Sequence, residues 1–125
     1  MEHCQRPLFD TLTDCRNWIE AAIEYTNGTH DFDDICAGIY GGKFHLLARP
    51  EGCLVLEIHT YPRKRALHVF LAGGDLSGVK HLPDLEQLAR DMGATEITAT
   101  GRAGWARVLA SQGWAKSHVT MRKEI

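Results

Sequence analysis

The spacing of apolar residues predicts two helices in the first third of the chain. Apolar side chains recur at helical intervals over 11–25 and again over 31–41, and each run ends at asparagine or glycine residues that stop helices. The first ten residues lack this repeat. We therefore expect a short N-terminal arm (1–10) followed by one domain (11–125).

Beyond the two helices the period changes to that of strands. Three strands are predicted over 43–49, 53–61 and 65–71, with short turns at Pro50 and Pro62 between them. Short turns join neighbouring antiparallel strands, so this part should form an antiparallel meander.

The remainder alternates between helices and strands. The pattern predicts a helix over 82–92, a strand over 95–100, a helix over 102–112 and a final strand over 115–122. A helical crossover favours a parallel pair, so the strand at 95–100 should lie parallel to the strand at 65–71. The whole order predicts an α/β (α+β) domain with a mixed sheet.

The predicted core consists of the apolar positions that keep their period across these elements. Its members are Leu54, Leu56, Ile58, Leu67, Val69, Leu85, Leu88, Ala89, Ile97, Val108 and Leu109. The second strand then has one apolar face, and Glu57 and His59 lie on its other face.

Composition and charge exclude several classes of protein. The chain has 125 residues, of which 44% are apolar, which suits one domain with a core of its own. Its 14 basic and 16 acidic residues rule out a strongly basic protein that coats nucleic acid, and a nucleic-acid partner is not expected. No apolar stretch could span a membrane and the N-terminal residues carry no hydrophobic signal, so we expect a cytoplasmic protein without a membrane partner.

The four cysteines give no pattern of their own. Cys4, Cys15, Cys36 and Cys53 are too far apart in sequence for a CxxC unit. They are expected to be reduced thiols, and no metal site is predicted.

In the order of these elements the chain resembles the GNAT superfamily of acyl-CoA N-acyltransferases over nearly its whole length, from about residue 12 to 123, and most specifically from Gly73 to Trp114. The resemblance rests on the order of the elements and on two short stretches, 88–94 and 110–114, of which the second is similar to the closing turn of the family. It implies a GNAT-like mixed sheet with two N-terminal helices. It also implies acetyl-CoA as cofactor and N-acetylation of a small amine or a protein.

A narrower resemblance is carried by two glycine-rich stretches. Residues 73–76 and 101–105 are similar to those of short GNAT-like proteins from tailed bacteriophages, whose genes commonly lie among genes for virion assembly. This implies a virion-associated or morphogenesis component with a protein partner, found in the host cytoplasm or the virion.

The pyrophosphate loop of the family, Arg/Gln-x-x-Gly-x-Gly/Ala, falls on the six residues that begin at Gly73. The cofactor-binding positions would be Gly73, Gly74, Leu76 and Gly78, and only Gly78 matches the motif. Asp75 places a negative charge where a pyrophosphate would lie. The other interpretation of these glycines is a turn that releases the chain from the edge of the sheet.

The chain also lacks one of the catalytic residues that this resemblance implies. The tyrosine that the family often uses as an acid corresponds to Leu109, which cannot donate a proton. Glu57 and His59 are the candidate bases, with His68 nearby if the register of the meander allows it. Alternatively these polar residues form a solvated sheet face.

These departures favour a catalytically degenerate GNAT-fold protein that acts by protein contact, has no cofactor, and binds acetyl-CoA weakly or not at all. The alternative is an active acyl-CoA-dependent N-acetyltransferase. Fold alone does not decide between them, because function depends on the site.

Overall fold

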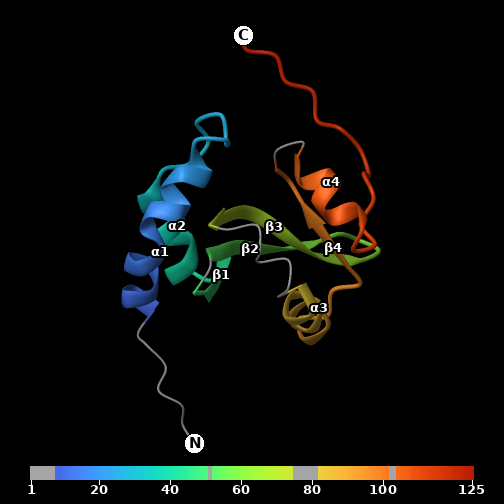
Figure 1. Cartoon of the computed structure of the whole chain (residues 1–125), viewed down its shortest axis with the longest axis horizontal. Coiled ribbons are helices and arrows are strands. Elements are labelled where there is room, and N and C mark those ends of the chain that lie inside the picture. Colours follow the sequence, from blue (N-terminus) through green and yellow to red (C-terminus); the bar gives the residue numbers. More distant parts are fainter. Residues whose placement is uncertain (1–7, 51, 75–81, 102–103) are drawn as a thin grey trace, which may run out of the picture.

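The computed structural model describes residues 8–50, 52–74, 82–101 and 104–125 (Figure 1). Its elements along the chain are α1 (Leu8–Ile23), α2 (Phe32–Tyr40), β1 (Phe44–Arg49), β2 (Gly52–Thr60), β3 (Arg65–Gly74), α3 (Leu82–Asp91), β4 (Glu96–Ala99) and α4 (Gly104–Ala110). No helix in the described parts of the chain is both long enough and apolar enough to cross a membrane.

The sheet has the order β1-β2-β3-β4. β1 with β2 and β2 with β3 are antiparallel, and β3 with β4 is parallel. Figure 1 shows α1 and α2 together beside β1 to β3, while α3 and α4 lie on opposite sides of the sheet. The predicted mixed sheet with two N-terminal helices and an antiparallel meander is confirmed.

The largest differences from the predicted elements are at two element ends and in one predicted strand that does not form. α1 begins at Leu8 and therefore includes the last residues of the predicted arm, because Leu8 and Leu12 continue the helical spacing of Cys15 and Ile19. β3 extends to Gly74, beyond the predicted end of the strand. Residues 115–122 form no strand, although their sequence alternates as a strand would.

Asp31 caps the start of α2. The Asp31 side chain accepts a hydrogen bond from the Asp34 backbone N–H at 2.9 Å, and the Asp34 side chain accepts one from the Asp31 N–H at 3.0 Å. This reciprocal capping box satisfies free amides at the helix start. It also fixes the loop between α1 and α2, which contributes to the site described below.

Buried apolar residues form two clusters, one on each face of the sheet. The second cluster lies under α3 and contains Leu56, Leu67, Val69, Leu85 and Ala89 from the predicted core. The first cluster lies under α1 and α2, and prediction missed it. Its buried members are Cys15, Ile19, Ile35, Ile39, Phe44, Cys53, Val55 and Leu71.

Several members of the predicted core are only partly buried. They are Leu54, Ile58, Leu88, Ile97 and Val108. The prediction assumed that one apolar face of the meander forms the core. In the structure both faces are covered at one end of the sheet, so Val55 and Leu56 are both fully buried although they are adjacent in sequence.

Candidate functional site

A row of four side chains crosses the sheet on the face that α1 and α2 cover. Glu57 is paired with Phe44 on β1 and with His68 on β3, and His68 is paired with Thr98 on β4. Directly paired residues point to the same face of a sheet. Phe44 belongs to the first cluster, which identifies this face as the one beneath α1 and α2.

A β-bulge marks the place where this face changes from apolar to polar. Val55 is paired with Leu71 while the next residue, Leu56, is paired with Val69, so Phe70 is an extra residue in β3. The side chains on the Val55 side of the bulge belong to the first cluster. Those on the other side, at Glu57 and His68, are polar.

The polar groups are connected by short contacts. His59 Nε2 lies 3.3 Å from Glu57 Oε1, and His59 Nδ1 lies 3.2 Å from the Tyr61 hydroxyl. The side chain of Glu57 is 20% exposed and that of His59 is 31% exposed. This chain of contacts therefore leads from the partly buried sheet face to the exposed Tyr61.

His68 occupies the centre of this group. Its Nδ1 lies 2.7 Å from Thr98 Oγ1 and its Nε2 lies 3.3 Å from Thr100 Oγ1. The His59 and His68 rings are stacked, with their centroids 4.7 Å apart and an interplanar angle of 18°. Contacts from two strands thus hold the His68 ring in one orientation.

The surroundings of His68 favour its neutral form. Burial lowers the pKa of this imidazole, and the neighbouring His59 lowers it further, while the Glu57 carboxylate acts in the opposite direction. A neutral imidazole near pH 7 can accept a proton. The environment of His68 therefore favours the form of the ring that can accept a proton.

The edge of β3 is open directly beside this group. β3 pairs with β4 only from Ala66 to Val69, and the Thr100 N–H then donates to the Val69 carbonyl at 3.3 Å. β3 itself continues to Gly74. In the described part of the chain no strand pairs with this edge of β3 over 70–74, so backbone groups there can bind an extended chain that carries amides.

An aromatic group borders the site at the bulge. Phe70 stacks on Phe44 with centroids 5.4 Å apart, and His30 from the loop between α1 and α2 lies edge-on to Phe70 at 4.8 Å. A hollow of about 490 Å³ opens beside them. It is lined by Thr29, His30, Asp34, Ala37, Gly38, Lys43 and Phe44.

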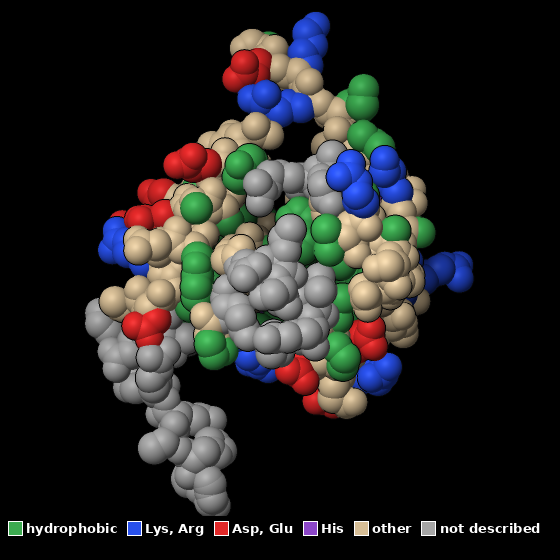
Figure 2. Space-filling view, in the orientation of Figure 1, with side chains coloured by type: hydrophobic (Ala, Val, Ile, Leu, Met, Phe, Trp, Pro, Cys, Tyr) green, Lys and Arg blue, Asp and Glu red, His purple; other side chains and the backbone are tan. Residues whose placement is uncertain are grey.

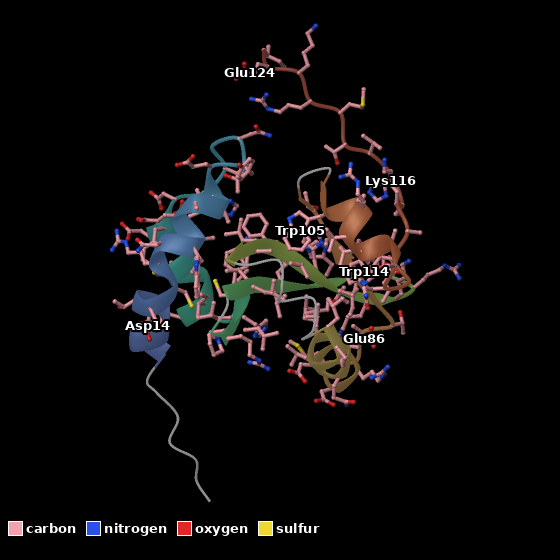
Figure 3. All side chains as sticks on the ribbon, in the orientation of Figure 1. Asp14, Glu86, Trp105, Trp114, Lys116 and Glu124 are labelled. Carbon is pink, nitrogen blue, oxygen red and sulfur yellow. The ribbon has the colours of Figure 1, made fainter. Side chains whose placement is uncertain are left out.

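Charge is unevenly distributed around the site. Figure 2 shows acidic side chains gathered over α1 and α2 and basic ones on the side of α4. In Figure 3, Trp105 lies near the start of α4 above the sheet, and Trp114 lies beyond the other end of that helix.

Gly73 has a structural reason to be glycine. A Cβ at this position would lie 2.7 Å from the backbone oxygen of Trp18 and 2.8 Å from its Cβ, so α1 can approach β3 only at a glycine. Gly74 ends the strand with φ of +100°. Both residues belong to β3 rather than to a free loop, while the other predicted loop positions, Leu76 and Gly78, lie outside the described residues, as does Asp75.

The structure brings together the two predicted bases, Glu57 and His59, and adds three residues that the sequence analysis did not select. These are Thr98, Thr100 and Phe70. Thr98 and Thr100 are two residues apart after α3, and this spacing in the sequence indicates one polar face.

Leu109 is buried in α4. Among the residues that the structure describes, no group of three His, Cys, Asp or Glu side chains could hold a metal ion.

Comparison with solved structures identifies the fold of the chain. A "probable acetyltransferase" structure matches with a TM-score of 0.65 and 13% identity, over 100% of this chain and 97% of that chain. An acetyltransferase from Trypanosoma brucei matches with a TM-score of 0.64 and 15% identity, over 91% and 94%. Glucosamine-6-phosphate N-acetyltransferase from Arabidopsis thaliana matches with a TM-score of 0.62 and 17% identity, over 90% and 92%. No family model and no curated protein matches the sequence.

The chain therefore has the fold of the GNAT acetyltransferases. The expectation of a catalytically degenerate protein that acts by contact is wrong, because these structural matches are acetyltransferases and favour the alternative. That expectation gave most weight to single positions such as Leu109 and Asp75. It could not take account of a polar row assembled from three strands. Nothing in the comparisons supports a phage or virion origin.

Proposed function

We propose that the chain is an acyl-CoA-dependent N-acyltransferase that acts on a primary amine. One observation carries the proposal: His68, held by two threonines on the partly buried face, lies next to the open edge of β3. A proton acceptor and a binding edge are the two groups that such a transfer needs from the protein.

Acyl-CoA would supply the acyl group as a thioester at the end of an extended arm that contains amides. The edge of β3 that faces away from β2 is open over 70–74 and fits such an arm, because it offers N–H and C=O groups along an extended strand. Gly74 adds no side chain at the end of this edge.

His68 would take the proton that the amine loses as the new C–N bond forms and the C–S bond breaks, through the Thr100 hydroxyl, which gives its own proton to Nε2 and takes that of the amine. Thr98 and Thr100 orient its ring, and the Glu57 carboxylate stabilises the positive charge that the ring acquires. The stacked His59 contacts both Glu57 and Tyr61 and so helps to hold the carboxylate beside the ring. The released thiolate must be protonated by water, because Leu109 has no proton to give.

The surroundings suit an amine as acceptor. Acidic side chains over α1 and α2 raise the local concentration of cationic molecules. Phe70, which is only partly buried, offers apolar surface to the body of such a molecule.

The test is release of free thiol from acetyl-CoA in the presence of a polyamine, a lysine-containing peptide, an amino sugar and an aromatic amine. We expect turnover with at least one of them, and a fall of roughly 10²- to 10⁴-fold in kcat for His68→Gln. The matched control is His45→Gln. His45 pairs with Leu56 and so lies on the opposite face of the sheet, and its replacement should leave kcat unchanged.

Two results would contradict the proposal. One is the absence of thiol release with every amine at millimolar acetyl-CoA. The other is a His68→Gln variant that is as active as the parent while its circular dichroism shows that it is folded.

A further inference from the structure

A hydroxyl and an imidazole lie together at the end of β4 in the arrangement that activates a nucleophile. Thr100 Oγ1 lies 3.3 Å from His68 Nε2, and Thr98 Oγ1 lies 2.7 Å from Nδ1 of the same ring. A nucleophilic hydroxyl needs a base within hydrogen-bond reach and a third group that orients this base. Thr100, His68 and Thr98 have these three positions relative to one another.

The contacts of the His68 ring suit one tautomer. When Nδ1 carries the proton, it donates to Thr98 Oγ1, and Nε2 keeps its lone pair toward the Thr100 hydroxyl. Burial and the neighbouring His59 lower the pKa of His68, which favours the neutral ring that this tautomer requires. The ring can therefore take the hydroxyl proton of Thr100.

The two threonines differ in how a substrate can reach them. Thr98 is partly buried within β4, whereas Thr100 follows the last residue of that strand and is exposed. The backbone of Thr100 is nevertheless fixed, because its N–H donates to the Val69 carbonyl at 3.3 Å. Thr100 therefore presents an accessible hydroxyl from a fixed position, and Thr98 serves only to orient the ring.

The open edge of β3 begins directly beside this hydroxyl. β3 leaves β4 after Val69, so an extended arm bound along 70–74 has one end beside Thr100. Free N–H groups of the same edge can donate to the oxygen of a thioester held there. The indole of Trp105 lies close to Gly101, at 3.1 Å from the place of a Cβ, and Figure 3 shows it above the sheet. It offers apolar surface to an acyl chain on Thr100.

We propose that Thr100 is a nucleophile that takes the acyl group when no amine is bound, and that water then releases this group as a carboxylic acid. The chain would thus have a second activity, hydrolysis of acyl thioesters through an acyl-threonine. This activity rests on the proposed function for its acyl donor, and it adds a covalent intermediate that direct transfer to an amine does not need.

The reaction has two steps. In the first, Thr100 Oγ1 forms a bond to the thioester carbon, its proton passes to His68 Nε2, and the C–S bond breaks. His68 releases that proton to solvent, and water protonates the thiolate. In the second, water attacks the ester carbon and gives a proton to Nε2, and the ester C–O bond breaks as Thr100 Oγ1 takes this proton back. One thioester and one water become one carboxylic acid and one thiol.

The test treats the full chain, without any amine, with acetyl-CoA and separately with p-nitrophenyl acetate, an activated ester that needs no CoA site. After quenching in acid, peptide mass spectrometry should find an acetyl group on Thr100 with either donor, and hydroxylamine should remove it as it removes esters and not amides. Thr100→Ser should keep this ester and Thr100→Val should lose it. His68→Gln should slow its formation by roughly 10²- to 10⁴-fold.

Thr60→Val is the matched control for Thr100→Val. Thr60 alternates with His59 along β2 and so lies on the other face of the sheet, and this variant should form the ester at Thr100 as the parent does. Circular dichroism of each variant shows that it is folded.

The outcomes separate this proposal from the proposed function. Amine-dependent thiol release with no ester on Thr100 from either donor would overturn the acyl-threonine and leave the transferase supported. An ester from p-nitrophenyl acetate alone would support the nucleophile and contradict acyl-CoA as the donor. A folded Thr100→Val variant that hydrolyses both donors as fast as the parent would overturn the role of Thr100.

Discussion

The two faces of the sheet differ in how they are used. On the face under α3, the inward residues of the central strands are apolar along their whole length, from Leu54 to Ile58 in β2 and from Leu67 to Ala72 in β3. On the other face, the first cluster ends at the bulge, and Glu57, His59 and His68 follow. The face under α3 is therefore apolar throughout. On the other face the apolar cluster ends at the bulge, and polar side chains follow it.

The bulge at Phe70 makes this division possible. Without the extra residue, β3 would keep one alternation throughout, whereas here Phe70 and Leu71 both pack on the first cluster. The bulge also lies where β3 leaves β4. One irregularity therefore separates the core from the polar row and stands at the start of the open edge.

The largest expected change in stability is on the α3 face. Leu67 has no exposed surface, so Leu67→Ala should lower the free energy of unfolding by about 2–5 kcal/mol through the cavity that it leaves. Leu88→Ala removes the same atoms from a partly exposed position on the same face and should cost less. Urea unfolding of both variants measures the difference. Equal losses would show that burial on this face is not what sets stability.

A smaller loss is expected where α1 meets the sheet. Gly73→Ala would bring a methyl group to 2.7 Å from the Trp18 backbone oxygen, so the helix must shift. We expect a decrease of about 1–3 kcal/mol in the free energy of unfolding, as for other overpacked sites. The measurement is urea unfolding monitored by tryptophan fluorescence. An unchanged midpoint would mean that α1 is not held at this distance.

The smallest effect is the dependence of stability on pH that His68 contributes. The pKa of His68 is lowered below 6.5 in the folded chain, so the unfolded chain binds more protons as the pH falls. The contribution is therefore complete above pH 6.5 and is lost as the pH falls from 6.5 toward the pKa of the folded state. His59 and Glu57 face the same ring, so the test subtracts the curve of His68→Gln from that of the parent. Identical curves for the two would contradict the lowered pKa.

The sequence predicts the fold well because periodicity is a local property. The meander and the parallel crossover both follow from spacing and turn chemistry. The register is different, because it depends on pairs of residues far apart in sequence. The pairing of Glu57 with His68 and the extra residue at Phe70 cannot be found in either strand alone.

The same limit explains the errors. Alternation correctly places Val55 on the same face as Glu57 and His59, and the predicted core therefore omitted it. In the structure α1 and α2 bury the Val55 end of that face. The segment 115–122 alternates like a strand, and pairing it needs an edge that local pattern does not locate. The functional expectation failed in a similar way, since it relied on single motif positions rather than on groups that the sheet brings together.

The most direct test of the central claim, that the face carrying His68 is a site for acyl transfer, is a titration of the chain with acetyl-CoA followed by backbone amide NMR shifts. Saturation is expected only at high concentration, because residues 73–78 match the family motif at Gly78 alone. The account predicts saturable shifts at 70–74 and at Thr100, next to His68, with little change in β1. Absence of shifts up to several millimolar, or shifts confined to the α3 face, would contradict it.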